Sequence, residues 1–434
     1  MPRLSRTTLL LQGPVGPFFR GLARELERRG DRVLRVVFNG GDELFAEPRH
    51  SIPFRGDHAQ WPTFLAAVLR DHAVDRVVLF GDCRPLHATA LQVCRSIGVG
   101  AWVVEEGYLR PWFLTFEAVG VNARSRLSRD PADYHGVEGI SDRTPFSVPN
   151  RLPARARPYR WVFTKRVVAC MAYYLALALL RCRYAGYRHH RCDSLVTEAA
   201  MWVRAGLRKL VYHFQERHAL ARLQDTPYFL IPLQVEGDSQ VEVHSRYSSV
   251  RHFITEAVRS FARHAPRDCT LVLKHHPMDR GYRDYTGLVA MLRTAHGLGS
   301  RLVYVHDLPL PALLHAARGV VGINSTALLS ALQHGRPVKC LGTALFDLPG
   351  LTNQGPLDAF WNAPGAVDLE LLRAYLSHLV VHTQLNASSS SRQSTWDLLD
   401  RLPDFAPTLP TRHLHLLPQV LGSEVPVATP SMVG

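Results

Sequence analysis

Three residues with basic or imidazole side chains follow a short apolar stretch in the second half of the chain. Residues 270–273 favour β-structure, Lys274, His275 and His276 come next, and Pro277 then ends regular structure. These side chains therefore emerge at the carboxyl end of a strand, which is the edge where open α/β sheets bind ligands. The spacing predicts an anion site. For His275 there is an alternative role, in which its side chain only packs or pairs locally.

A second stretch, residues 319–335, has the complementary form of an apolar strand, a small polar turn and a helix. Ser325 and Thr326 lie in the turn, where a helix presents free backbone N–H groups to a phosphate. Lys274, His276 and these two hydroxyl groups supply the donors that a nucleotide phosphate needs. The two stretches together predict a nucleotide-phosphate site.

Charged side chains also follow two expected strands in the first half of the chain. Asp82 and Arg84 come after one strand, and Glu105 and Glu106 are expected on the loop after the next. Neighbouring carboxylates repel, which raises one pKa and suits a general acid or base. The alternative is a solvated loop acid that pairs with Arg110.

The order of the expected elements is that of a doubly wound α/β protein. A βαβ unit opens the chain. Its first turn, residues 12–17, lacks the G-x-G-x-x-G spacing, so it predicts dinucleotide binding only weakly and also fits a turn that merely reverses the chain. Residues 234–245 are expected to form a loop. Strands are expected at 7–11, 32–38, 76–80, 101–104, 229–233, 271–273, 301–305, 320–323 and 338–341.

A chain of 434 residues exceeds one typical core, so we expect more than one domain. The sequence predicts two Rossmann-like α/β domains facing a cleft, as in a GT-B glycosyltransferase. No Asp-x-Asp occurs, which argues against the metal-chelating GT-A type, and no metal site is predicted. The predicted divisions are an N-terminal acceptor-side domain at 1–150, a basic amphipathic helical segment at 151–225, a C-terminal nucleotide-sugar domain at 226–350, a helical region at 351–405 and a tail at 406–434.

The formal net charge of +14 indicates an anionic partner, which nucleic acid, phospholipid or an acidic sugar would satisfy. The seven cysteines are scattered and form no C-x-x-C pair, so the sequence indicates neither a zinc site nor a disulfide framework. A reducing cytoplasm fits this cysteine usage best. The apolar stretch near the N-terminus is too short for the core of a signal peptide.

The longest apolar run, residues 167–180, lies within a strongly basic segment. The run is shorter than the roughly 18 to 20 residues that span a bilayer, so no transmembrane segment is predicted. Its aromatic and cationic flanks are typical of an interfacial helix on anionic lipid. A buried core helix with basic ends is the alternative.

Seven motifs in order, between about residues 9 and 351, resemble the KpsS-type capsular polysaccharide biosynthesis/export proteins, a β-Kdo glycosyltransferase family. The motifs are 11–19 (LQGPVGPFF), 38–42 (FNGGD), 79–85 (LFGDCRP), 105–111 (EEGYLRP), 234–240 (QVEGDSQ), 274–277 (KHHP) and 322–326 (GINST).

The resemblance implies a Kdo transferase that needs no cofactor beyond its donor substrate, CMP-Kdo. It implies an anionic acceptor of the lysophosphatidylglycerol type, whose product starts the linker of the capsule polysaccharide. The implied location is the cytoplasm, peripherally on the inner membrane. Other capsule assembly and export proteins are the expected partners, and nucleic acid is not.

The resemblance also implies roles for individual residues. His276 is similar to the histidine of a His-Pro motif that meets the cytidylate phosphate, and Ser325 and Thr326 look like companion hydroxyls. A β-product from a β-donor requires net retention, and two displacements need a carboxylate nucleophile and an acid/base. The nucleophile is expected to be Asp238, with Glu236 as the fallback.

Glu105 or Glu106 is the expected acid/base, and Arg110 is expected to pair with the Kdo carboxylate. Asp238 has an alternative role as the cap of the following turn. Two other functions stay open, namely a non-catalytic GT-B scaffold in capsule export and a GT-B transferase that uses another nucleotide sugar. Contacts with sugar or acceptor are expected for Gln12, Asp82, Arg84, Arg110 and Glu236.

Overall fold

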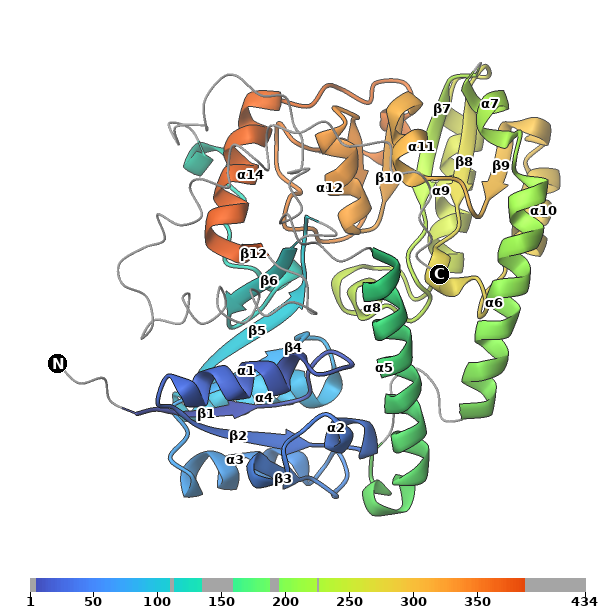
Figure 1. Ribbon diagram of the computed structural model, residues 1–434. Helices are drawn as coiled ribbons and strands as arrows, with labels where there is room; N and C mark the ends of the chain where they lie inside the picture. Colours follow the sequence, from blue (N-terminus) through green and yellow to red (C-terminus); the bar gives the residue numbers. More distant parts are fainter. Residues whose placement is uncertain (1–4, 110–112, 135–158, 188–194, 225, 387–434) are drawn as a thin grey trace. The chain divides into compact units, whose positions relative to one another are not determined.

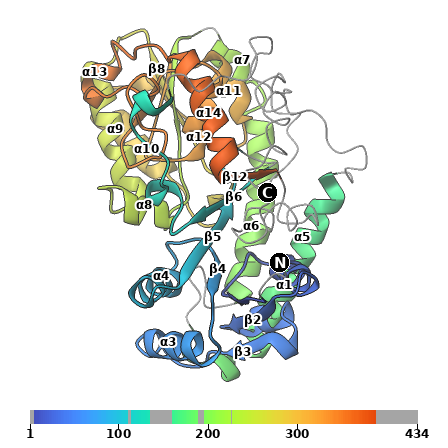
Figure 2. The same ribbon diagram turned by 90° about the vertical axis from the view of Figure 1, so that its left-hand side faces the viewer.

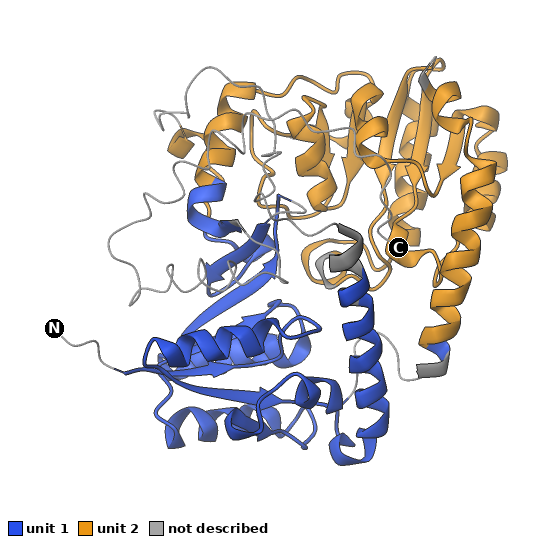
Figure 3. Cartoon of the chain, viewed as in Figure 1, with its two compact units in different colours: residues 1–126, 151–197, 379–415 blue, residues 127–150, 198–378, 416–434 orange. Residues whose placement is uncertain are grey.

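The computed structural model describes residues 5–109, 113–134, 159–187, 195–224 and 226–386 (Figure 1). The chain forms two compact units, drawn in blue and orange in Figure 3. Unit 1 comprises residues 1–126, 151–197 and 379–415, and unit 2 comprises residues 127–150, 198–378 and 416–434. Each unit has its own mainly or wholly parallel sheet.

A seven-stranded sheet forms the centre of unit 1, in the order β12-β6-β5-β4-β1-β2-β3. Strands β1 to β5 pair in parallel, whereas β6 pairs antiparallel with both β5 and β12. The strands are β1 (Thr7–Leu10), β2 (Arg32–Val37), β3 (Ser51–Pro53), β4 (Arg76–Phe80), β5 (Gly100–Glu106), β6 (Phe113–Ala118) and β12 (Gln384–Asn386).

Helices cover both faces of this sheet. Helix α1 lies on one face, where Leu22 and Leu26 are buried, and α3 and α4 lie on the other face, which buries Trp61 and Leu65 (Figure 2). The helices of unit 1 are α1 (Phe18–Arg28), α2 (Gly40–Leu44), α3 (Trp61–Asp71), α4 (Pro85–Ile97) and α5 (Tyr159–Leu179), with short 3₁₀ turns at Pro48–His50, Asn122–Arg124 and Arg181–Tyr184.

Unit 2 contains a five-stranded, wholly parallel sheet in the order β11-β10-β7-β8-β9. Strands β7 and β8 are buried along their whole length, as expected where helices cover both faces of a parallel sheet. The strands are β7 (Tyr228–Pro232), β8 (Thr270–Lys274), β9 (Leu302–Val305), β10 (Gly319–Gly322) and β11 (Val338–Cys340).

The helices of unit 2 begin with α6, whose first three residues are assigned to unit 1, and end with α14, whose last turn is assigned to unit 1. They are α6 (Leu195–Gln215), α7 (Ala219–Gln224), α8 (Ser239–His244), α9 (Val250–His264), α10 (Thr286–Ala295), α11 (Leu310–Ala316), α12 (Thr326–Gln333), α13 (Leu357–Phe360) and α14 (Leu369–Thr383), with 3₁₀ turns η3 (Pro131–Tyr134), η5 (Pro277–Asp279) and η6 (Gly299–Arg301).

The predicted α/β class with two Rossmann-like sheets is confirmed, but two local predictions are wrong. Glu105 and Glu106 lie inside β5 rather than on a loop, because pairing with β6 continues the strand beyond Val104. Residues 234–245, expected to form a loop, include helix α8. Strands β6 and β12 were not expected, whereas helix α6 lies within the segment at 151–225 that was expected to be helical.

The five-part domain division stays a prediction, although β12, from the predicted helical region 351–405, joins the sheet of unit 1. Arg110 and the predicted tail at 406–434 lie outside the described residues.

Helix α5 packs closely on α2 through two adjacent glycines. A Cβ atom on Gly40 would lie 2.2 Å from the carbonyl oxygen of Ala176, and one on Gly41 would lie 2.4 Å from the ring of Tyr173. Tyr173 is correspondingly buried, whereas Met171 is 68% exposed. The apolar run therefore has one core face and one exposed face. Contact of the exposed face with lipid stays a prediction.

We expect Gly40→Ala to lower the free energy of unfolding by about 1–3 kcal/mol, because the added methyl group forces α5 away from α2. Gly287→Ala on α10 is the matched control, since its Cβ meets no described atom within 4 Å. Denaturant titration measures both variants. Equal stabilities for the two variants would contradict the close packing.

Candidate functional site

The predicted phosphate residues lie at the carboxyl edge of the unit 2 sheet. Lys274 is the last residue of β8, and its buried ammonium group donates to the carbonyl oxygens of His275 and His306, both at 3.4 Å. Burial lowers the pKa of Lys274 to about 8, partly offset by Asp307 and Glu216, so the side chain is mostly cationic at neutral pH.

The two histidines after Lys274 have different surroundings. His276 caps η5, where its Nδ1 accepts a hydrogen bond from the backbone N–H of Met278 at 3.2 Å. His275 is buried, and its Nδ1 lies 2.7 Å from the hydroxyl oxygen of Tyr304. Burial lowers the pKa of His275 to about 3, so it is neutral at physiological pH. This geometry favours the packing role for His275.

The hydroxyl residues come from the β10–α12 turn. Ser325 is the N-cap of α12, and its Oγ accepts a hydrogen bond from the N–H of Ala327 at 3.2 Å. Thr326 is the first helical residue. In the sheet order only β7 lies between β10 and β8, so Ser325 and Lys274 lie at the carboxyl ends of two strands that flank β7.

Hydrogen bonds connect these loops through the loop after β7. The Gln234 amide donates to Oδ1 of Asn324 at 3.0 Å and accepts from the N–H of Asn324 at 3.2 Å. On the other side, the Asp279 carboxylate accepts from the N–H of Glu236 at 2.7 Å. Gln234, Asn324 and Asp279 were not predicted as site residues. Gln234 and Asn324 lie within the motifs at 234–240 and 322–326, and this position is the sequence feature that could have identified them as site residues.

The two candidate nucleophiles differ in their contacts. The Glu236 carboxylate accepts a hydrogen bond from the Tyr285 hydroxyl at 2.7 Å. Asp238 is half-buried directly before α8, and its carbonyl oxygen accepts from the N–H groups of Val241 and Glu242 at 2.8 and 3.2 Å. Asp238 thus occupies the helix-start position that its capping alternative requires.

In unit 1, Gln12 and Arg84 lie together in a buried polar cluster. The Gln12 amide donates to the Asp42 carboxylate at 2.9 Å and to the Tyr187 hydroxyl at 3.1 Å, while Arg84 donates to Oε1 of Gln12 at 3.0 Å. Burial raises the pKa of Asp42, and Tyr173 of α5 donates to the same carboxylate at 3.4 Å. The hydrogen bonds of Gln12 thus join Asp42, Arg84 and Tyr187 of the same unit, and its contact with sugar or acceptor stays a prediction.

Asp82 has other partners. Its carboxylate is fully buried, accepts from the N–H of Val121 at 3.2 Å and lies 3.6 Å from the guanidinium of Arg124. The structure therefore gives Asp82 and Arg84 separate surroundings, although they are two residues apart.

Glu105 and Glu106 point to opposite faces of the sheet because successive side chains alternate along a strand. The two carboxylates therefore do not face one another, as they could on a loop. Glu105 pairs with Thr115 and shares its face with Glu117 of β6.

Glu117 is a buried acid that the sequence did not reveal, because β6 itself was not expected. Its carboxylate accepts hydrogen bonds from the hydroxyl groups of Tyr108, at 2.8 Å, and Ser125. Burial raises the pKa of Glu117 to about 7 despite these hydrogen bonds. A carboxyl group that titrates near neutral pH has the pKa of a proton donor or acceptor, and it lies on the same face as Glu105.

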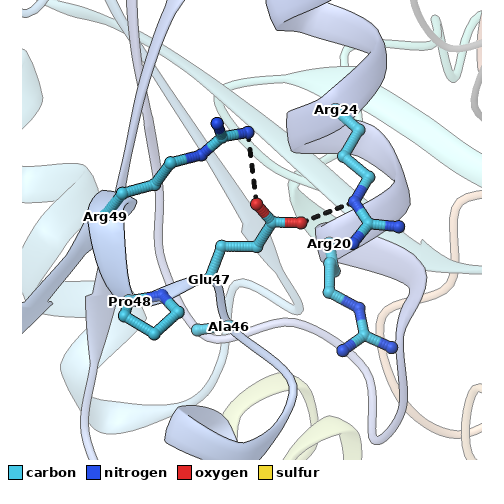
Figure 4. Close-up of a pocket in the computed structure, with 6 residues that line it drawn as sticks. All are labelled: Arg20, Arg24, Ala46, Glu47, Pro48 and Arg49. Carbon is cyan, nitrogen blue, oxygen red and sulfur yellow. Dashed lines mark hydrogen bonds and ion pairs between the residues drawn. The ribbon is translucent and has the colours of Figure 1, made fainter.

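Each unit has a surface pocket among its described residues. The pocket in Figure 4, of about 620 Å³ in unit 1, contains Arg20, and its Glu47 already pairs with Arg24 at 2.5 Å and Arg49 at 3.2 Å. No predicted site residue lines it. A second pocket, of about 720 Å³ in unit 2, lies beside the end of α8 and is lined by residues 243–246, 339–343, 347 and 355–357.

Within the described ranges, no group of three His, Cys, Asp or Glu side chains is arranged to hold a metal ion. In the same part of the chain, every helix is too short or too polar to span a bilayer.

The Glu117 pKa predicts a specific pH dependence. A carboxyl group whose pKa is raised from 4.5 to about 7 on folding stabilises the fold below the lower value, and this stability is lost as pH rises through 7. Glu117→Gln removes this loss, so the variant should gain roughly 1–3 kcal/mol relative to the native chain between pH 5 and pH 8. Denaturant titrations across this range measure the difference. A difference independent of pH would contradict the assignment.

Comparison with known proteins gives a consistent result over most of the chain. Residues 75–389 match the family model described as capsule polysaccharide biosynthesis protein. The chain is 44% identical to the capsule polysaccharide export protein KpsS of Escherichia coli, over 87% of this chain and 95% of that protein. It is 38% identical to the capsule polysaccharide modification protein LipB of Neisseria meningitidis, over 88% and 91% of the two chains.

Among solved structures, the KpsC β-Kdo 2,7 transferase of Thermosulfurimonas dismutans aligns with 92% of this chain and 99% of that chain, at 14% identity and a TM-score of 0.40. The chain belongs to the capsule polysaccharide biosynthesis protein family.

Proposed function

We propose that this protein is a retaining β-Kdo transferase. It moves Kdo from CMP-Kdo to a lipid acceptor of the lysophosphatidylglycerol type and so starts the linker of the capsule polysaccharide. The observation that carries the proposal is the set of phosphate donors at the edge of the unit 2 sheet, in a chain of the capsule family. Lys274, His276, Ser325 and Thr326 supply cationic, imidazole and hydroxyl groups on loops that follow β8 and β10.

In this mechanism the unit 2 donors neutralise the departing cytidylate without a metal ion. The Asp238 carboxylate attacks the anomeric carbon, and the bond to the CMP phosphate breaks, with its electron pair leaving on CMP. The acceptor hydroxyl then attacks the resulting glycosyl ester, loses its proton to the base and releases Asp238. Glu236 is the fallback nucleophile.

The base is proposed to be Glu105 rather than Glu106, because Glu105 shares its sheet face with the near-neutral acid Glu117. Arg110 is proposed to pair with the Kdo carboxylate. Asp82 and Arg84 are proposed to shape the acceptor side, where Arg84 is held by Gln12. Gln12 would then act by positioning the side chain of Arg84.

The same proposal includes the lipid acceptor and the location of the protein on the cytoplasmic side of the inner membrane. Helix α5 supports it, because Val168, Met171, Leu175 and Leu179 form an exposed apolar stripe on the side away from Tyr173. An exposed stripe of this kind is typical of a protein that meets lipid.

The direct test is incubation of the full-length chain with CMP-Kdo and a fluorescent lysophosphatidylglycerol. The proposal expects a product heavier by a single Kdo. A second function is suggested by the relative named as an export protein, namely a scaffold that binds lipid-linked polysaccharide without transfer. Acceptor binding with no product would support the scaffold, and product from UDP-sugars alone would identify another transferase.

Asp238→Asn should abolish transfer while leaving CMP affinity unchanged, because the amide retains the shape but is a poor nucleophile. Glu242→Gln is the matched control, since Glu242 is an exposed carboxylate on the adjacent α8 and should tolerate the change. Product formation and calorimetric CMP titration are measured on both variants. Near-normal transfer by Asp238→Asn would refute the nucleophile assignment.

The Lys274 pKa predicts how CMP binding depends on pH. Because the folded-state pKa is about 8, the ammonium charge is lost as pH rises through that value, and CMP affinity should fall. Lys274→Met should weaken CMP binding about tenfold at pH 7 and abolish this decline, since a charged hydrogen bond contributes about 1.5–3 kcal/mol.

Lys165→Met, on the exposed part of α5, is the control for loss of one positive charge. Calorimetry between pH 7 and pH 9.5 compares the three proteins. A native CMP affinity that is constant across this range would argue against Lys274 as a phosphate ligand. His276→Ala at pH 7 is an independent check on the same site.

A further inference from the structure

Helix α6 divides its acidic residues and its apolar residues between two faces. Within residues 195–218 the only acids are Glu198 and Glu216, and both are buried. The exposed charged residues of this stretch, Arg204 and Arg217, are cationic. The inner face of such a helix contacts the rest of the protein, and its outer face is suited to contact another partner.

The inner face of α6 holds the segment that follows η5. Glu198 accepts a hydrogen bond from the Tyr282 hydroxyl at 2.6 Å. Arg208 donates to the carbonyl oxygen of Arg280 at 2.9 Å and to the Asp284 carboxylate at 2.8 Å. Gly281 allows this approach, because a Cβ atom there would lie 2.3 Å from the carbonyl oxygen of Met201.

The end of α6 reaches the surroundings of Lys274. The Glu216 carboxylate accepts hydrogen bonds from the backbone N–H groups of His306, at 2.7 Å, and Asp307, at 2.8 Å. The Tyr212 ring stacks on the His306 ring at 3.7 Å between centroids. Because Lys274 donates to the carbonyl oxygen of His306, α6 is joined to the proposed phosphate site through one residue.

The outer face of α6 is apolar and exposed. Val203, Leu207, Leu210 and Phe214 follow the i, i+4, i+7, i+11 spacing of one helix face, with 65%, 61%, 61% and 67% of their surfaces exposed. Trp202 and Val211 flank this outer stripe and are also exposed. Four large apolar side chains in a row are more than scattered surface residues and indicate a contact surface.

We propose that the outer stripe of α6 docks on an anionic lipid bilayer. Its charges favour this occupant, because cations without exposed acids beside an apolar stripe are attracted to anionic headgroups. A second copy is disfavoured, since a two-fold contact through this face would bring Arg204 and Arg217 together with their like-charged equivalents. This choice of a bilayer of anionic lipid as the partner rests on the proposed function, in which the acceptor is itself an anionic lipid. Docking through α6 then brings the Lys274 and His276 loops to the membrane that holds the acceptor.

The test is co-sedimentation of the full-length protein with phosphatidylglycerol vesicles and with phosphatidylcholine vesicles. We expect binding to the anionic vesicles that weakens with salt and exceeds binding to phosphatidylcholine. The double variant Leu207→Glu/Phe214→Glu should weaken it at least about tenfold, because it removes two apolar anchors and adds two repelled charges. Met291→Glu is the matched control, since Met291 is 57% exposed on α10 of the same unit and lies outside α6.

Two further measurements keep the outcomes distinct. Unchanged vesicle binding by the double variant would overturn the proposal, as would a native dimer in light scattering that this variant alone dissociates. Transfer to a soluble short-chain acceptor should be retained in the double variant, with the native circular dichroism spectrum. Failure of the native protein to transfer Kdo would refute the proposed function, whereas the vesicle result separately decides the docking face.

Discussion

The burial of the Lys274 ammonium group at the carboxyl end of β8 is the constraint on which unit 2 depends. An unpaired cation in a buried position is costly, so its charge must be balanced by carboxylates and carbonyl oxygens nearby. The balance comes from Glu216 and Asp307, together with the carbonyl oxygen of His306. Glu216 is held at the end of α6, so the electrostatics of the strand edge fix the position of a helix whose outer face is exposed among the described residues.

Unit 1 shows the same principle with the opposite charge. The Asp42 carboxylate is buried at the start of α2, and Gln12, Asn39 and Tyr173 surround it with hydrogen-bond donors. These residues come from separate motifs and from α5, so one buried acid fastens the first two strand-end loops to a helix more than a hundred residues away. The glycines of α2 permit that contact. Gln12, Asn39 and Asp42, which belong to the recognised motifs, therefore maintain the fold. Their presence in these motifs does not require each of them to contact substrate.

Strands with continuous apolar runs, such as β4, β7 and β8, could be predicted from the sequence because both faces of a parallel sheet are buried. Strand β6 could not, since its run includes Thr115 and Glu117, and its place depends on antiparallel pairing with β5. That pairing extends β5 and turns Glu105 and Glu106 to opposite faces. The positions of Lys274, His276 and Ser325 at strand ends followed from local pattern. The links made by Gln234, Asn324 and Glu216 are long-range hydrogen bonds, which local pattern does not encode.

The nucleotide phosphate is proposed to bind at the strand edge formed by the loops after β8 and β10. A structure of the full-length protein with bound CMP is the measurement that tests this claim most directly. It should place the phosphate oxygens within hydrogen-bonding distance of Lys274 or His276 and of the Ser325–Thr326 turn. A phosphate bound among Arg20, Arg24 and Arg49 in the pocket of unit 1, or away from both sites, would contradict the account.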